Sequence, residues 1–92
     1  MPTVKDIKIT KPTDAQIAEC SKWPIWTHEK DEFDWHYTET EKCLILEGKV
    51  TVYSTDRSQS VSFGKGDYVV FPTDLPCIWK ITEAVRKHYD FE

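Results

Sequence analysis

The side chains of this sequence best suited to chemistry are its few thiols and imidazoles. The three cysteines are Cys20, Cys43 and Cys77, and the three histidines are His28, His36 and His88. The cysteines are odd in number and no CxxC spacing occurs, so neither a disulfide framework nor a zinc knuckle is indicated. We therefore expect reduced thiols. A thiolate and an imidazole on the same side of a strand would suit a late transition metal such as zinc, iron or copper.

The stretch GKGDYVVFPTDLPCIW, residues 64–79, raises the question of why a cysteine lies there. It contains a glycine turn, an apolar run that stops at Pro72, and then Cys77 directly before Ile78 and Trp79. The turn lacks the Lys-Ser/Thr ending and the following helix of a phosphate-binding loop, so we interpret it only as a turn.

The elements that must position these residues are short apolar runs bounded by turn chemistry. Eight short strands are predicted, at 4–10, 32–37, 42–47, 49–53, 60–63, 67–71, 77–81 and 85–91, with turns at 47–49, 54–59 and 64–67. Residues 23–26 are held extended by Pro24. One short helix is predicted over 13–20, because Thr13 and Gln16 form a capping-box pattern. This order favours an antiparallel sandwich or barrel over an alternating α/β fold.

The alternation within two of these strands predicts which side chains face the core. In EFDWHY, Phe33, Trp35 and Tyr37 alternate with polar residues and should face inward. CLIL, residues 43–46, is apolar on both faces, so Leu44 and Leu46 should be covered by the helix, by residues 23–26 or by a second subunit. A homodimer through the Leu44 and Leu46 face is therefore one expected partner arrangement.

The size and charge of the chain limit what it can contact. Its 92 residues suffice for one domain, and 12 basic against 16 acidic side chains give a net charge of −4 with no basic stripe. We expect no nucleic-acid partner. No apolar stretch approaches the roughly 20 residues of a membrane span, and the start has no signal-peptide character. We expect no membrane partner and a cytoplasmic location, or an organellar one if a targeting segment has been removed.

Two spacings resemble the signature motifs of the cupin superfamily. They are Glu41 and Gly48 in ETEKCLILEGKV, separated by six residues, and Gly66 and Pro72 in GDYVVFP, separated by five. The chain is more closely similar to the cupin-3, ureidoglycine-aminohydrolase-like type, through WPIW, FDW, ILEGKV, KGDYVVFP and VRKHY. The resemblance implies an all-β fold, a small RmlC-like jelly-roll barrel with one short N-terminal helix. The single domain would span 1–92, with the strand and helix at 1–22 and the barrel core at 23–91.

The resemblance also implies where a metal would bind. Cupins usually carry two histidines before the glutamate and a third after the proline, and these four residues hold a divalent metal. Here Cys77 stands at the third histidine position, and the first two fall either on Trp35 and Tyr37 or on Asp34 and His36. A zinc, iron, copper or nickel site would use Glu41, Cys77 and His36, with Tyr37 as the alternative to His36. Strand alternation weakens this set, because it points His36 away from the aromatic face.

Cys77 has two other interpretations. As a nucleophile it would need a lowered thiol pKa, but the negative charge of Glu41 would raise that pKa. As a small buried residue it would simply line a pocket. We expect an internal pocket walled by Trp35, Tyr37, Glu41, Cys77 and Trp79. The predicted function is a small-molecule-binding cupin that has largely lost the usual metal site. The alternative is a metal-dependent enzyme acting on a small polar metabolite, which the resemblance to ureidoglycine aminohydrolases implies would be nitrogenous.

Overall fold

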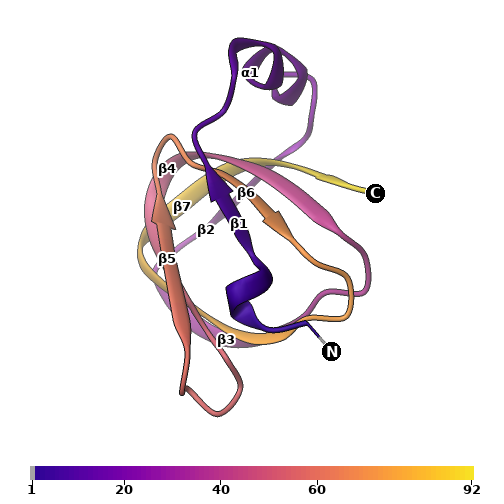
Figure 1. Ribbon diagram of the computed structural model, residues 1–92. Coiled ribbons are helices and arrows are strands. Elements are labelled where there is room, and N and C mark those ends of the chain that lie inside the picture. Colours follow the sequence, from indigo (N-terminus) through magenta and orange to yellow (C-terminus); the bar gives the residue numbers. More distant parts are fainter. Residues whose placement is uncertain (1) are drawn as a thin grey trace.

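The fold is an antiparallel sheet rolled into a barrel, with one short helix at one end (Figure 1). The computed structural model describes residues 2–92. Its elements are the 3-10 helix η1 (Val4–Asp6), strand β1 (Lys8–Thr10), helix α1 (Asp14–Cys20), and strands β2 (Ile25–His28), β3 (Asp31–His36), β4 (Glu41–Tyr53), β5 (Ser60–Gly64), β6 (Tyr68–Phe71) and β7 (Pro76–Phe91). The predicted all-β fold with one short N-terminal α-helix is confirmed. None of the helices among residues 2–92 has the length and apolar character needed to cross a bilayer.

Two long strands, β4 and β7, hold the barrel together. The strand order is β1-β6-β4-β7-β2, with β3 added on β7 and β5 added on β4. β4 pairs with β6 through its first half and with β5 through its second half, and it pairs with β7 along its length. β7 pairs first with β3 and then with β2. Both strands therefore pass from one half of the barrel to the other.

The predicted turn at 47–49 is wrong. Gly48 lies inside β4 with a φ of 102°, and the pairing of β4 with β7 shifts register three times between Ile45 and Val50. Bulges of this kind bend a strand without ending it. The predicted strands at 42–47 and 49–53 are consequently one bent strand, and those at 77–81 and 85–91 likewise form one strand, β7.

The N-terminal segment differs partly from its prediction. Residues 4–6 form η1, which is capped by the side chain of Thr3, so only Lys8–Thr10 of the predicted strand at 4–10 pairs in the sheet, with β6. The predicted helix is present as α1. The backbone N–H of Gln16 donates to Thr13 Oγ1 over 3.2 Å, and the Thr13 N–H donates to Gln16 Oε1 over 2.9 Å. The capping box is therefore formed in both directions.

Replacing Thr13 with alanine should lower the free energy of unfolding by about 1 kcal/mol, because the Gln16 N–H loses its acceptor. Urea denaturation measures this change. Thr55→Ala is the matched control, because Thr55 lies in an exposed turn outside any helix and its replacement should change stability by less than about 0.5 kcal/mol. An equal effect of both variants would show that the cap contributes nothing.

One main hydrophobic core fills the barrel, and a smaller cluster lies under the helix. The smaller cluster contains Cys20, Leu44 and Tyr68, with Trp23, Leu46 and Val70 packed against it. The helix and Trp23 therefore cover the outer face of CLIL within the chain. A homodimer through Leu44 and Leu46 stays a prediction.

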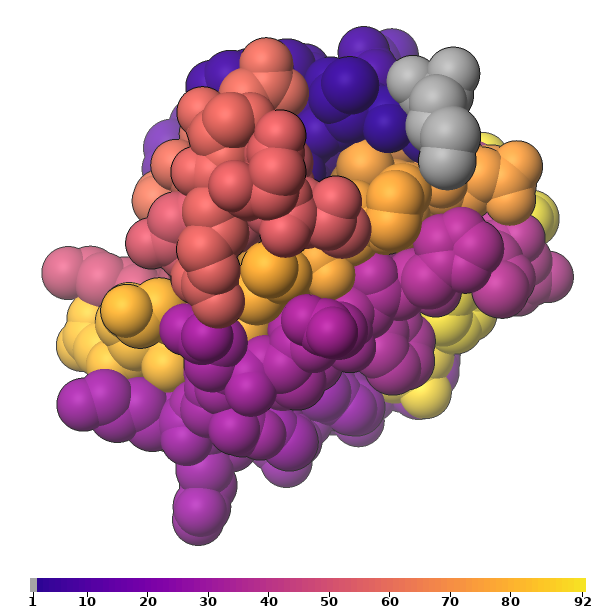
Figure 2. All heavy atoms as spheres, turned by 90° about the horizontal axis from the view of Figure 1, so that it is seen from below, coloured from indigo at the N-terminus to yellow at the C-terminus, as the bar shows by residue number. Residues whose placement is uncertain are grey.

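The opposite end of the barrel is closed by neighbouring segments. Viewed from below, the turn at the tip of the β4–β5 hairpin, the start of β7 and strand β3 lie next to one another (Figure 2). Arg57 in that turn reaches β3, where its Nη2 lies 2.8 Å from Glu32 Oε2. This ion pair thus links the β4–β5 turn to β3.

Candidate functional site

An aromatic cavity of about 260 Å³ opens from the interior of the barrel. It is lined by Trp26, Phe33, Trp35, Tyr37, Glu41, Trp79, Lys87, Tyr89 and Phe91. Four of the five predicted pocket residues, Trp35, Tyr37, Glu41 and Trp79, are brought together here. The lining comes from β2, β3, β4, β7 and the residue that follows β3, so the site is built from segments that are far apart in the sequence. We call this cavity the aromatic pocket.

A buried ion pair forms the polar floor of the aromatic pocket. Lys87 Nζ lies 2.6 Å from Glu41 Oε2, and both residues are at most 5% exposed. The Cys43 thiol donates to the same carboxylate oxygen over 2.9 Å, and Lys87 Nζ lies 3.5 Å from Cys43 Sγ. Alternation along β4 turns Glu41 and Cys43 inward together, and the register pairs Ile45 with Lys87. The floor is therefore a compact arrangement of carboxylate, ammonium and thiol.

Aromatic rings surround the Lys87 ammonium. Its Nζ lies 4.8 Å from the ring centroid of Trp79 and 5.0 Å from that of Trp26, distances at which a cation is attracted to the ring face. Burial alone would lower the pKa of Lys87, but Cys43 and Glu41 outweigh it and the net shift is upward. Lys87 is therefore a cation at neutral pH, with its counter-charge in direct contact.

Tyr37 supplies a second polar group to the aromatic pocket. Its ring stacks on Phe71 with centroids 4.6 Å apart, and its hydroxyl oxygen accepts a hydrogen bond from Trp79 Nε1 over 2.9 Å. Burial, reinforced by the charge of Glu41, holds the pKa of Tyr37 well above its ordinary value. The phenol consequently keeps its proton and can act as a donor.

The mouth of the pocket carries two exposed aromatic side chains. Trp35 is 49% exposed and Phe91 is 45% exposed, although both line the cavity. Trp35 faces the same side of β3 as Phe33 and Tyr37, as the alternation predicted, and its ring contacts both of them edge-on. It lies at the rim, whereas Tyr37 is buried. Apolar surface is thus left uncovered at the entrance.

Cys77 does not line the aromatic pocket. It shares the inward face of β7 with Trp79, but its short side chain is packed in the main core and is 1% exposed. It borders a separate hollow, together with Asp34 and His36. Burial raises the pKa of the Cys77 thiol to about 12. A nucleophilic role for Cys77 is therefore disfavoured, because the thiol is inaccessible and stays protonated.

The predicted metal ligands are not brought together. Glu41 lies in the aromatic pocket and is paired with Lys87, Cys77 lies in the core, and His36 is exposed on the outer face of β3. Across residues 2–92 there is no group of three or more His, Cys, Asp or Glu side chains arranged to hold a metal ion. The predicted set of Glu41, Cys77 and His36 thus does not form one site.

The three thiols should react slowly in the folded protein. All are buried, and with a pKa of about 12 only about one Cys77 in ten thousand is a thiolate at pH 8. We expect an aromatic disulfide reagent to label fewer than one thiol per chain within minutes under native conditions and all three in urea. A fast native phase that disappears in Cys77→Ser would instead show Cys77 to be accessible and activated.

Lys87 is the main site residue that sequence reasoning missed. The cluster of Arg86, Lys87 and His88 has the composition of a solvated strand face. Arg86 is exposed, and His88 Nδ1 lies 3.0 Å from the carbonyl oxygen of Trp23. Lys87, however, lies two residues after Val85, which is 2% exposed, so both side chains lie on the same face of the strand. This period-two pattern could have predicted that Lys87 faces inward.

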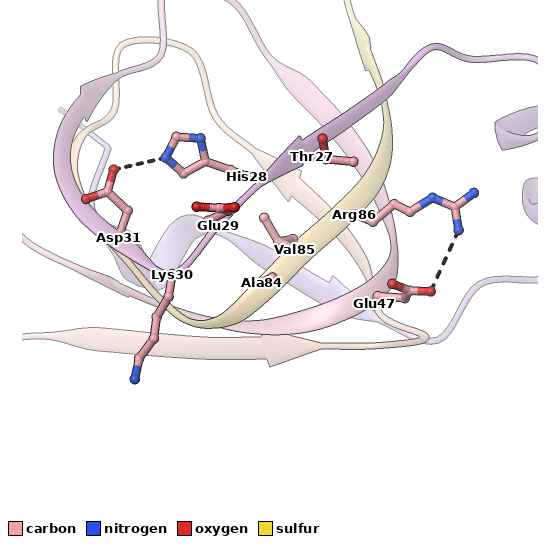
Figure 3. Close-up of a pocket in the computed structure, with 9 residues that line it drawn as sticks. All are labelled: Thr27, His28, Glu29, Lys30, Asp31, Glu47, Ala84, Val85 and Arg86. Atoms are coloured by element: carbon pink, nitrogen blue, oxygen red, sulfur yellow. Dashed lines mark hydrogen bonds and ion pairs between the residues drawn. The ribbon is translucent and has the colours of Figure 1, made fainter.

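A second hollow lies on the outside of the barrel (Figure 3). Four of its titratable side chains form two separate pairs, since His28 Nε2 lies 2.9 Å from Asp31 Oδ2 and Arg86 Nη1 lies 3.8 Å from Glu47 Oε1. Lys30 points away from both pairs in the close-up. The groups do not converge on one point, so the aromatic pocket is the better candidate site.

Comparison with known proteins places the chain in a family. The family model described as the EutQ-like cupin domain matches residues 16–89. A DUF861 family protein from Thermotoga maritima is 48% identical, with a TM-score of 0.88, over 95% of this chain and 100% of that one. No curated protein sequence matches significantly.

More distant solved structures share the fold. The EutQ protein of Clostridium difficile is 16% identical with a TM-score of 0.65, over 73% of this chain and 52% of that one. A putative ethanolamine utilization protein Q from Salmonella typhimurium LT2 is 18% identical with a TM-score of 0.65, over 92% and 68%. The resemblance to ureidoglycine aminohydrolases in particular stays a prediction. The match over residues 16–89, on a barrel of the expected topology, makes this chain a member of the EutQ-like cupin family.

Proposed function

We propose that this chain binds a small molecule in the aromatic pocket. The observation that carries the proposal is the pairing of an aromatic cavity of about 260 Å³ with a buried, charged floor made by Glu41 and Lys87. Small-molecule sites are mostly apolar, concave and supplied with a few convergent polar groups. Glu41, Lys87 and Tyr37 are those groups here.

The composition of the floor favours binding over a purely structural role. Burying two charges carries a desolvation cost that a pair of well-packed apolar residues would avoid. A polar floor next to an open cavity nevertheless offers hydrogen bonds to whatever enters. The exposed rings of Trp35 and Phe91 at the mouth are apolar surface that a bound molecule would cover.

The residues present do not fit the metal-dependent alternative. The carboxylate of Glu41, the position that is a metal ligand in cupins by resemblance, already contacts the ammonium of Lys87 at 2.6 Å. A divalent cation at the same carboxylate would face that positive charge in a poorly solvated site. Cys77 and His36 lie elsewhere and would not complete its coordination. We therefore derive no metal-dependent step.

Trp35→Ala should weaken ligand binding by roughly tenfold without unfolding the protein, because Trp35 supplies apolar contact at an exposed rim. Three of the four tryptophans line the aromatic pocket, so tryptophan fluorescence reports on it directly. The test titrates native protein with a panel of small planar compounds, including indole, phenol and benzene derivatives.

The matched control is Tyr53→Ala, which removes an aromatic ring at the far end of β4, outside the aromatic pocket. Saturable binding by the native protein and by Tyr53→Ala, with the loss confined to Trp35→Ala, supports the proposal. The proposal fails if no compound of the panel binds, or if Trp35→Ala and Tyr53→Ala bind equally well.

A further inference from the structure

We propose that the aromatic pocket selects a neutral, planar ligand that presents an N–H donor beside a carbonyl acceptor, as primary amides and lactams do, to Glu41 and Tyr37. This inference rests on the proposed function and names the ligand class of the same site. It follows from one unused acceptor, one unused donor and the charge balance of the floor.

The unused acceptor is Oε1 of Glu41. Both hydrogen bonds to this carboxylate, from Cys43 and from Lys87, end on Oε2. Among residues 2–92, every side-chain nitrogen or oxygen that is closed off from solvent has a partner, and Oε1 accepts no bond from them. Because Glu41 lines the cavity and is 4% exposed, Oε1 must be open toward the cavity. It can accept a hydrogen bond there only from a ligand or from water.

The unused donor is the hydroxyl proton of Tyr37. The phenol oxygen accepts from Trp79 Nε1, and within the described part of the chain no acceptor receives its own proton. Tyr37 is 2% exposed and lines the same cavity as Glu41. A buried hydroxyl usually has a partner, so this proton is available to an acceptor on the ligand. The aromatic pocket thus offers one acceptor and one donor, the two partners that the N–H and the carbonyl of an amide require.

The charge balance of the floor disfavours a charged ligand. Lys87 and Glu41 are 2.6 Å apart and neutralise one another. A cationic ligand at Glu41 would approach the Lys87 ammonium, and Trp26 and Trp79 already have that ammonium against their faces. An anionic ligand at Tyr37 or Lys87 would approach the Glu41 carboxylate. In a poorly solvated pocket, each of these like-charge contacts is expensive.

The shape of the cavity limits the ligand to a small, flat compound. A volume of about 260 Å³ lies below the range of sites for drug-sized ligands, so a single ring with one polar group is the appropriate size. The walls are aromatic rings, including the stacked pair of Phe33 and Trp79 with centroids 6.1 Å apart. Flat ligands gain most from such walls.

The test compares four compounds that share a benzene ring and differ in the polar group. They are benzamide, methyl benzoate, benzylamine as its ammonium ion, and benzoate. Their dissociation constants for the native protein are measured at pH 7 by tryptophan fluorescence. Benzamide should bind at least tenfold more tightly than each of the others, because it alone is neutral and offers both a donor and an acceptor.

Two variants test the assigned partners. Tyr37→Phe should weaken benzamide and methyl benzoate alike, roughly tenfold, because both present a carbonyl oxygen to the phenol proton. Tyr53→Phe is the matched control with no expected change. Glu41→Gln removes the negative charge and leaves Lys87 uncompensated, so benzoate should gain at least tenfold relative to benzamide. Circular dichroism establishes that each variant is folded.

The outcomes separate the two proposals. If none of the four compounds binds the native protein, the inference is overturned, and the proposed function fails with it when the wider panel of indole, phenol and benzene derivatives gives no binding either. If benzylammonium or benzoate binds more tightly than benzamide, binding in the pocket stands and the neutral ligand class is overturned. If methyl benzoate binds as tightly as benzamide, a ligand N–H donor to Glu41 is unnecessary for binding, and the inference is likewise overturned.

Discussion

Lys87→Met should lower the free energy of unfolding by about 3–5 kcal/mol at pH 7. The substitution keeps most of the length of the side chain but removes the ammonium, which leaves the Glu41 carboxylate buried without its counter-charge. It also removes the cation from the ring faces of Trp26 and Trp79. Breaking a buried pair from one side costs more than the pair contributes, because the remaining charge has lost its compensation.

Urea denaturation of native protein and variant between pH 5 and pH 9 measures this effect. The folded-state pKa of Lys87 is raised, so its contribution is fully present below the ordinary lysine value of about 10.4 and is lost only at higher pH. The stability difference should therefore be constant near neutral pH.

Two further variants serve as controls for Lys87→Met. Lys80→Met removes an exposed lysine from the same strand and should change stability by less than about 0.5 kcal/mol. The double variant Glu41→Gln/Lys87→Met removes both charges and should recover more than half of the loss. If Lys87→Met costs less than about 1 kcal/mol, the Glu41–Lys87 pair does not hold the floor of the pocket in solution.

Parts of the aromatic pocket follow from the sequence because the period of a strand fixes which face a side chain takes. Glu41 shares its parity with Cys43, and the motif spacing agrees with that assignment. Trp35 and Tyr37 follow from the same kind of alternation in the strand at 32–37. Lys87 does not, because a lysine in a basic cluster is normally solvated, and its burial depends on the distant Glu41 across the β4–β7 pairing.

Other differences between prediction and structure arise because a sequence pattern predicts which face of a strand a side chain takes, but not which groups it contacts there. Cys77 faces inward as predicted, but its short side chain ends in the core instead of the cavity. Gly48 has the composition of a turn, yet its positive φ serves a bend within one continuous strand. Long-range pairing with β7 decides between a turn and a bulge, and local sequence carries no information on it.

Gly48→Ala should lower the free energy of unfolding by on the order of 3 kcal/mol. The φ of 102° is strained for any residue with a Cβ. An added Cβ would also lie 2.7 Å from Val85 Cα, and the carbonyl of Ala84 would be closer still. Both contacts are with the backbone of β7, so neither can be relieved by moving a side chain.

Gly66→Ala is the matched control, since Gly66 has a φ of 90° and nothing lies within 4 Å of its added Cβ. Urea denaturation should show a loss of about 1 kcal/mol there, from backbone strain alone. The additional loss of stability in Gly48→Ala, compared with Gly66→Ala, then measures the close approach of β4 to β7 at Val85, which lies two residues before Lys87.

The same bend fixes the register that brings Lys87 to Glu41, so Gly48→Ala should also weaken benzamide binding, whereas Gly66→Ala should not. Equal losses of stability in the two variants would mean that β7 moves away without cost, and the bend would then not be what positions the floor of the pocket.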